Sequence, residues 1–94
     1  MFEIEVLGDG RIRLAGRLDA AEADRARTAL RAVSGPATMD FEHLEYISSA
    51  GLGVIVESYK RLHDAGHSLK LVRLKPRIRT IFTYAGLDKV LTIE

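Results

Sequence analysis

Strand-like and helix-like segments alternate along this chain, and that alternation restricts the possible folds most strongly. Residues 2–7 and 11–16 alternate apolar and charged residues with a period of two, and Gly8-Asp9-Gly10 between them favours a tight hairpin turn. From Asp19 onward, segments of helical periodicity are separated by short apolar segments. Strands that flank a helix pair in parallel through a right-handed crossover. The pattern therefore predicts an α/β fold of order β-β-α-β-α-β-α-β, with a mostly parallel mixed sheet that begins with an antiparallel hairpin.

Capping residues and apolar periodicity set the expected boundaries. Asp19 and Glu22 have the spacing of a capping box, so the first helix is predicted to open at Asp19 and to end before Gly35 and Pro36. The other predicted elements are a strand at 37–41, a loop at 42–46, a helix from the serines to 64, a strand at 67–74, a helix that begins at Pro76 and stops at Gly86, and a strand at 89–94.

Length and composition predict one domain, residues 1–94, in the cytoplasm. A chain of 94 residues has little room for two cores, and 47% hydrophobic with 29% charged residues is ordinary for a globular protein. The longest apolar run, residues 54–56, is far shorter than the roughly 20 residues that span a bilayer, and the N-terminus lacks the pattern of a signal peptide. We therefore expect no membrane insertion.

Charge and residue types argue against several classes of ligand. The chain has no cysteine and only three scattered histidines, so we expect no metal and no cofactor. A net charge of +1 does not indicate direct nucleic-acid binding. One local excess of basic residues is interpreted as a solvated rim, with binding to an anionic surface as the alternative; it comprises Lys70, Arg73, Lys75, Arg77 and Arg79.

The stretch EYISSAGLGVIV, residues 45–56, is the candidate functional segment, but it fits no enzyme motif. A hydrolase elbow needs a glycine where Ile47 stands, and a dinucleotide fingerprint needs a third glycine where Val56 stands. No phosphate-binding Gly-Lys-Ser/Thr motif occurs, and nothing couples a histidine to Ser49. We therefore expect no catalytic residue and no enzymatic activity.

Small residues at the start of the second predicted helix leave two interpretations open. Ser48 or Ser49 can cap the helix, or carry a regulatory modification. Gly51 and Gly53 disfavour a helix, so we expect them to allow close approach of a neighbouring strand or of a partner. Val54 lies opposite the predicted apolar stripe, where it either packs on another helix or contacts a partner; the stripe comprises Leu52, Ile55, Tyr59 and Leu62.

Residues 40–56, DFEHLEYISSAGLGVIV, resemble the signature of the STAS domain, found in sulfate transporters and anti-sigma-factor antagonists. That signature is typically D-[LF]-x-x-[LV]-x-[YF]-[IM]-D-S-[SA]-G-L-G. The segment LAGRLD, residues 14–19, resembles a second family marker, and YAGLDKV, residues 84–90, resembles the family's ending. The resemblance implies a small, bacterial, single-domain STAS fold over nearly the whole chain.

The antagonist branch of this family implies a role in signal transduction and transcription regulation by partner switching. By resemblance, Ser49 is phosphorylated by an anti-sigma factor that is itself a serine kinase, and a PP2C-type phosphatase reverses the modification. Unphosphorylated, the protein binds the anti-sigma factor, which releases its sigma factor. The expected partner-binding residues are Asp19, Ser48, Ser49, Ala50, Gly51, Gly53 and Val54.

The resemblance has one departure, and it allows one alternative function. Ser48 stands where many family members carry aspartate, which affects recognition by a kinase. The alternative function is that of a STAS accessory subunit of a lipid-transporting ABC system, which is not phosphorylated. Those subunits often carry threonine or glycine where this chain has Ser49-Ala50, so the sequence favours the phosphorylation switch.

Overall fold

A computed structural model describes residues 1–94, and it confirms the predicted α/β order with one additional 3-10 turn. The elements in chain order are β1 (Phe2–Val6), β2 (Arg11–Leu18), α1 (Ala23–Leu30), β3 (Ala37–Ile47), α2 (Ser49–Asp64), β4 (Leu69–Val72), α3 (Pro76–Tyr84), the 3-10 helix η1 (Leu87–Lys89) and β5 (Thr92–Ile93). None of the helices combines the length and the apolar character that a bilayer crossing would need.

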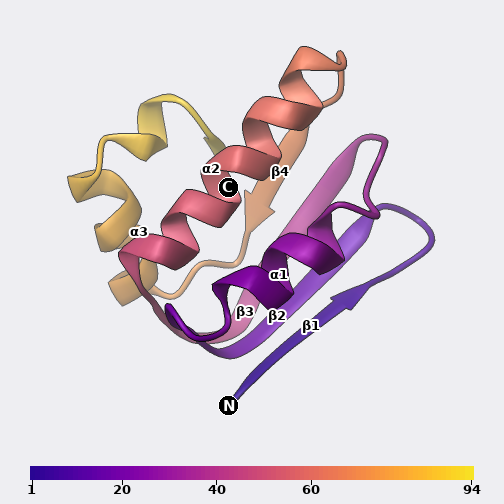
Figure 1. The fold of residues 1–94 in the computed structure, drawn as a ribbon. Coiled ribbons are helices and arrows are strands. Elements are labelled where there is room, and N and C mark those ends of the chain that lie inside the picture. The colour runs from indigo at the N-terminus through magenta and orange to yellow at the C-terminus, as the bar shows by residue number, and fades with distance from the viewer.

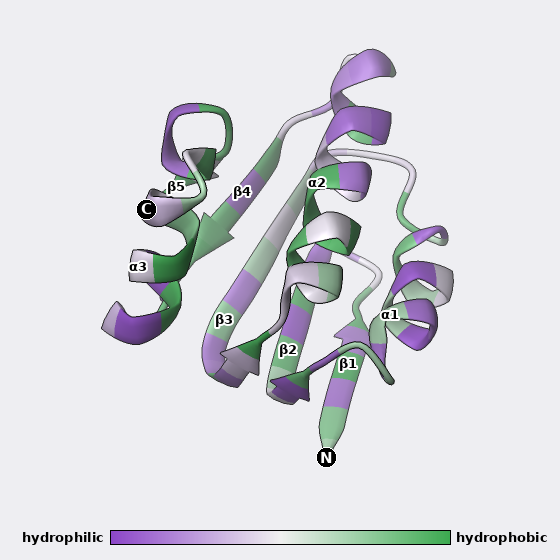
Figure 2. Cartoon of the chain, turned by 60° about the vertical axis from the view of Figure 1, so that its left-hand side comes forward, coloured by the Kyte–Doolittle hydropathy of each residue, from purple (hydrophilic) through white to green (hydrophobic).

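The five strands form one sheet in sequence order, and the helices cover one of its faces (Figures 1 and 2). β1 pairs with β2 in antiparallel orientation, and every later neighbour pairs in parallel. Along β2, the buried side chains of Ile12 and Leu14 alternate with the exposed side chains of Arg11 and Arg13. The sheet therefore has an apolar face toward the helices and a charged face toward solvent.

The core lies between the sheet and the three helices. It comprises 21 buried residues, of which 19 come from α1, α2, α3 and strands β1 to β4, and two, Val33 and Leu91, come from connecting segments. Phe41 of β3 and Phe82 of α3 meet edge to face with ring centroids 5.8 Å apart, which is a preferred geometry for aromatic pairs. Ala23, Ala26 and Leu30 are the buried residues of α1.

The third strand is longer than the sequence predicts, and the predicted loop at 42–46 is wrong. β3 continues to Ile47, and its register with β2 slips twice, each time with one extra residue on β3. At the first slip, a carboxylate oxygen of Asp40 accepts a hydrogen bond from the Glu42 amide at 2.9 Å. Because the extra residues shift the side chains, burial falls on Phe41, Leu44 and Ile47 at intervals of three.

Other boundaries differ by a few residues from those predicted. α1 begins at Ala23 instead of Asp19 and ends at Leu30, well before the glycine and proline that were expected to stop it. β4 and β5 are shorter than the predicted segments, and Lys89 at the predicted start of the last strand lies in η1. α2 spans 49–64 as predicted, and Pro76 opens α3 as predicted.

Candidate functional site

The carboxyl ends of β2 and β3 bring the two parts of the candidate site together. Leu18 at the end of β2 is in register with Ile47 at the end of β3. The Ser48 amide donates a hydrogen bond to the Leu18 carbonyl at 2.9 Å, which extends the pairing by one step. Asp19 and Ser48 therefore leave neighbouring strands at the same edge of the sheet, where α2 begins (Figure 1).

The two adjacent serines have different roles at the start of α2. Ser48 has an extended backbone, and its Oγ accepts a hydrogen bond from the Gly51 amide at 3.1 Å, so Ser48 is the N-cap. Ser49 is the first helical residue and is exposed. Its hydroxyl makes no hydrogen bond with another protein group. The fold thus uses the hydroxyl of Ser48 and leaves that of Ser49 free.

The two glycines of α2 also differ. A Cβ atom on Gly51 would lie 2.8 Å from the Leu18 carbonyl oxygen and 2.9 Å from Cγ1 of Ile47, which is too close for either contact. A Cβ atom on Gly53 would meet no atom within 4 Å, and Gly53 is exposed. Close approach to a neighbouring strand therefore explains Gly51, whereas nothing inside the protein requires glycine at position 53.

The prediction that Val54 contacts a partner is wrong. Its side chain is 0% exposed and belongs to the core, and Gly51 is buried as well, so neither residue offers surface to a partner. The buried face of α2 is rotated from the predicted stripe because the helix contacts α1 as well as β3 and β4. Leu52 and Tyr59 consequently lie half-buried at its margin. Ala50 remains exposed next to Ser49.

Asp19 caps a turn before α1, and the predicted capping box is only half formed. A carboxylate oxygen of Asp19 accepts a hydrogen bond from the Glu22 amide at 3.2 Å. The carboxylate of Glu22 accepts from Arg25 Nε at 3.0 Å instead of returning to Asp19. Asp19 is half-buried and forms no ion pair. It therefore places an unpaired carboxylate at the edge where α2 begins.

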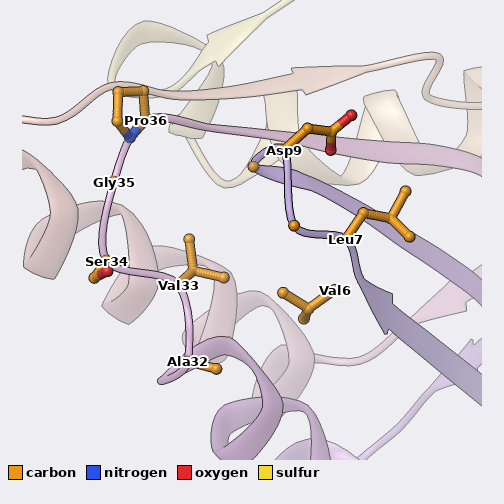
Figure 3. A pocket seen from close by; sticks show the side chains of 10 residues that line it. Val6, Leu7, Asp9, Ala32, Val33, Ser34, Gly35 and Pro36 are labelled. Carbon is orange, nitrogen blue, oxygen red and sulfur yellow. The ribbon is translucent and has the colours of Figure 1, made fainter.

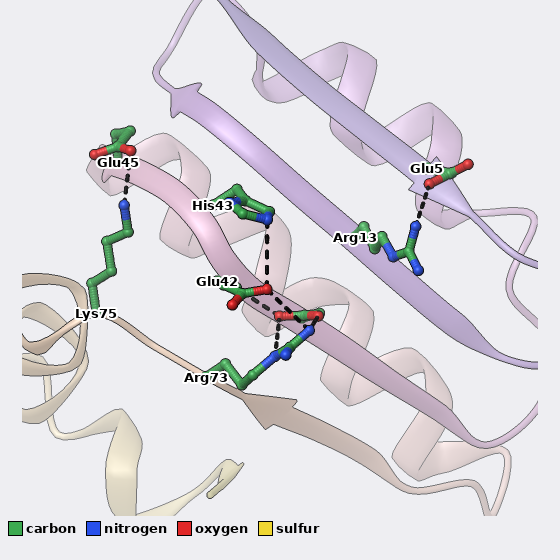
Figure 4. Close-up of polar contacts among 8 residues, drawn as sticks. Glu5, Arg13, Glu42, His43, Glu45, Arg73 and Lys75 are labelled. Carbon is green, nitrogen blue, oxygen red and sulfur yellow. Dashed lines mark hydrogen bonds and ion pairs between the residues drawn. The ribbon is translucent and has the colours of Figure 1, made fainter.

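Most of the basic cluster at 70–79 is paired with acidic residues. Lys75 Nζ lies 2.8 Å from a carboxylate oxygen of Glu45, and Arg73 Nη2 lies 3.2 Å from a carboxylate oxygen of Glu42 (Figure 4). The hydrogen bond from Lys75 holds the pKa of Glu45 below its usual value. The other ion pairs of the cluster join Arg73 to Asp40 and Lys70 to Glu94. This pairing favours the solvated rim over an anion-binding surface.

Near the carboxyl ends of β2 and β3 lies an exposed aromatic residue, Tyr46, that the sequence did not predict as part of the site. Tyr46 lies opposite Arg17 in the β2–β3 register, and the guanidinium carbon lies 4.2 Å from the centre of the Tyr46 ring. The sequence placed Tyr46 in a loop because the two register slips hide the alternation of β3. The pair adds an exposed aromatic and cationic surface near the ends of β2 and β3.

The opposite end of the sheet holds a hollow of about 480 Å³ between the β1–β2 turn and the α1–β3 connection (Figure 3). Its walls are mostly backbone and small side chains, including Gly8, Ser34 and Gly35. Its only ionisable side chain, Asp9, is hydrogen-bonded to Arg11 Nε at 3.0 Å. No group of three or more acidic residues or histidines is placed to hold a metal ion anywhere in the chain.

A comparison with known families identifies the family of this chain. The sequence profile described as "Mlab, STAS domain" matches residues 5–93, which is nearly the whole chain. The chain therefore belongs to the STAS domain family, and the resemblance to that family is confirmed.

The similar proteins include several anti-sigma factor antagonists. The chain is 30% identical to the anti-sigma-B factor antagonist of Bacillus subtilis over 89 residues, covering 92% of this chain and 82% of that protein. It is 26% identical to the anti-sigma F factor antagonist of Paenibacillus polymyxa, covering 87% of this chain and 74% of that protein.

Solved structures share the fold over the full chain. The Thermotoga maritima protein TM1081 matches with a TM-score of 0.83 at 21% identity, covering 99% of this chain and 85% of that chain. The anti-sigma factor antagonist SpoIIAA in its unphosphorylated form matches with a TM-score of 0.73 at 17% identity, covering 100% of this chain and 87% of that chain. Its phosphorylated form, from Bacillus, matches with a TM-score of 0.72 at 19% identity, covering 100% of this chain and 91% of that chain.

Proposed function

We propose that this protein is a phosphorylation-controlled antagonist of an anti-sigma factor. Unphosphorylated, it binds an anti-sigma factor that is also a serine kinase, through the exposed start of α2 and the neighbouring Asp19. That binding releases a sigma factor or a related regulator in the cytoplasm. The observation that carries the proposal is the free, exposed hydroxyl of Ser49 at the start of α2, beside a Ser48 that already serves as the cap.

The start of α2 is well suited to hold a phosphate without unfolding. Kinase action would join Ser49 Oγ to the γ-phosphorus of ATP, break the bond to ADP and remove the hydroxyl proton. The new group carries about two negative charges and lies at the positive end of the helix dipole, near unpaired backbone N–H groups. Since the cap comes from Ser48, modification of Ser49 removes no hydrogen bond of the fold.

The fold is expected to stay constant while the surface changes. This chain matches the unphosphorylated and the phosphorylated forms of SpoIIAA equally well, with TM-scores of 0.73 and 0.72. Partner release then comes from charge and bulk at the interface. Each loss of about 1.4 kcal/mol in binding free energy lowers the affinity about tenfold. A dianion placed against an apolar or acidic partner surface costs several kcal/mol of binding free energy. A PP2C-type phosphatase would restore binding by hydrolysing the ester.

Ser48 meets the structural requirement of a position where family members often carry aspartate. Both residue types are preferred N-caps, because either side chain accepts a hydrogen bond from the second or third helical amide. Ser48 accepts from the Gly51 amide in this way. The two residue types differ in charge, because serine leaves no negative charge beside Ser49. We therefore expect the cognate kinase not to require an acidic residue at position 48.

The test is phosphorylation by the cognate kinase with ATP, followed by intact-mass measurement and peptide mapping. We expect one phosphate on the wild-type protein and none on Ser49→Ala, which should still bind the anti-sigma factor. The matched control Ser48→Ala should still accept one phosphate. Ser49→Asp should remain folded but bind much more weakly. Phosphate found on Ser48 alone would refute the assignment to Ser49.

A second candidate is the accessory subunit of a lipid-transporting ABC system, which would not be phosphorylated; it is kept because Ser48, in place of the usual aspartate, affects recognition by a kinase. In that role the start of α2 is a constant contact surface. The protein would then co-purify with an ABC ATPase, and no phosphate would be found on Ser49 in cells. Substitution of Ser49 by aspartate would weaken that complex, whereas kinase and phosphatase deletion would leave it unchanged.

A further inference from the structure

A small cleft lies between the outer faces of α1 and α2, well away from Ser49. Its volume is about 240 Å³, below the range of pockets that enclose a drug-sized ligand. Ser58, one of its lining residues, lies nine residues after Ser49, or about 13 Å along the helix. The lining residues are Arg27, Arg31, Glu57, Ser58 and Arg61. The cleft has the size and the charge for one small polar group.

The only acidic residue of the lining is already neutralised. Arg27 binds Glu57 through two parallel hydrogen bonds, from Nε and Nη2, each 3.0 Å long. These bonds lower the pKa of the Glu57 carboxyl, which stays ionised at neutral pH. The third nitrogen of Arg27 pairs with Asp24 outside the cleft. Arg27 and Glu57 therefore form a closed pair that fixes α1 against α2.

The other two arginines keep free donors. Arg61 donates from Nη2 to the Leu30 carbonyl at 2.9 Å, and its remaining N–H groups have no protein partner. Arg31 forms neither an ion pair nor a side-chain hydrogen bond. With the Arg27–Glu57 pair cancelled, the lining carries the positive charge of these two guanidinium groups.

The hydroxyl of Ser58 completes the set of donors. Ser58 is the only buried polar residue of the protein, with 7% of its surface exposed. The hydroxyl of Ser58 has no protein partner, and because the protein contains no buried side-chain oxygen or nitrogen without one, this hydroxyl is the accessible part of the residue. Because Ser58 lines the cleft, the partner that its hydroxyl lacks can enter from there.

We propose that this cleft binds a phosphate group, either as the free ion or as the ester of a small molecule, between Arg31, Arg61 and the hydroxyl of Ser58. Two guanidinium groups and a hydroxyl donor match the charge and the several acceptor oxygens of a tetrahedral phosphate. The site needs no partner protein and does not depend on modification of Ser49. Its test is thus independent of the proposed switch.

The test is titration of the ¹⁵N-labelled protein with inorganic phosphate at constant ionic strength, followed by amide and arginine side-chain shifts. We expect saturable shifts confined to residues 27–31 and 57–61. Ser58→Ala should weaken binding about fivefold, the effect of one hydrogen bond, and Arg31→Gln about tenfold. Lys60→Gln is the matched control, since it removes one positive charge from the same helix outside the cleft and should change little.

Two further probes identify the chemistry of the ligand. Tighter binding of inorganic phosphate than of phosphoserine would assign the site to the free ion, and the reverse order would assign it to a phosphate ester. If acetate bound as tightly as phosphate, the proposal would be overturned, because the site would then bind any anion and would not distinguish a phosphate group. Shifts that never saturate, or an equal loss in Lys60→Gln and Arg31→Gln, would also overturn it.

Discussion

The two glycines of α2 offer a sharp test of the packing at the candidate site, because the same substitution should have opposite effects two residues apart. In Gly51→Ala the new methyl group would lie 2.8 Å from the Leu18 carbonyl oxygen and 2.9 Å from Cγ of Leu18. Ordinary contacts begin at 3.4 Å, so backbone must move to accept it. In Gly53→Ala the methyl group would enter open space.

The expected magnitudes follow from two opposing terms. Alanine favours a helix over glycine by about 1 kcal/mol, whereas overpacking of a fixed backbone costs about 1–3 kcal/mol. For Gly51→Ala the overpacking prevails, because the Leu18 carbonyl also accepts the hydrogen bond of the Ser48 amide. We expect its free energy of unfolding to fall by about 1–2 kcal/mol and that of Gly53→Ala to rise by about 0.5–1 kcal/mol.

The assay is urea unfolding followed by far-ultraviolet circular dichroism, with thermal unfolding as a second measurement. For a domain of this length, each change of 1 kcal/mol in the free energy of unfolding shifts the melting temperature by about 4–8 °C, so the melting temperatures of the two variants should differ clearly. The slope of the urea transition should stay constant in both. A Gly51→Ala protein as stable as the wild type, or shifts of the same sign in both variants, would refute the close-approach argument.

Three further predictions concern the serines at the start of α2, Asp40 of β3, and Gly53. Ser48→Ala should lose about 1 kcal/mol of stability in urea unfolding because it removes the cap of α2, whereas Ser49→Ala should lose almost none. The hydrogen bond from Arg73 lowers the pKa of Asp40 from its ordinary value of 3.8, so this carboxylate stabilises the fold above that pH and ceases to do so as the pH falls through the lowered value. Urea midpoints measured from about pH 5 to about pH 2 should therefore fall less steeply in Asp40→Asn than in the wild type. Gly53→Val should remain folded but weaken binding of the anti-sigma factor in a pull-down or calorimetric titration, and undiminished affinity would show that the partner does not approach position 53.

Local signals predicted the parts of the fold that depend on local chemistry. The hairpin turn needs a positive φ at Gly10, and α3 starts at Pro76 because its fixed φ and missing N–H suit the first helical position; both are confirmed. The full extent of β3 was not predictable, because two extra residues break its alternation and only the pairing with β2 reveals them. The length of β3 is therefore determined by its pairing with β2, which the sequence of β3 alone does not reveal.

The candidate site shows the same limit at single-residue resolution. Position alone assigned both serines to the start of α2, but only the observed backbone separates the cap, Ser48, from the first helical residue, Ser49. Likewise, the spacing of Val54 suggested an outward position, whereas packing of α2 against α1 as well as the sheet rotates its buried face so that it includes that side chain. Neighbouring elements decide which residues of a helix are accessible.

Adjacent residues of α2 thus divide the structural and the proposed regulatory tasks. Ser48 and Gly51 are fixed by the fold, one through the cap and the other through contact with Leu18. Ser49 and Gly53 are exposed, and neither is required by any contact within the protein. Modification or substitution at the second pair can therefore alter the surface at little cost in stability. A switch built in this way can change its partner affinity by large factors while the domain stays folded, because the groups that hold α2 in place are not the groups that change.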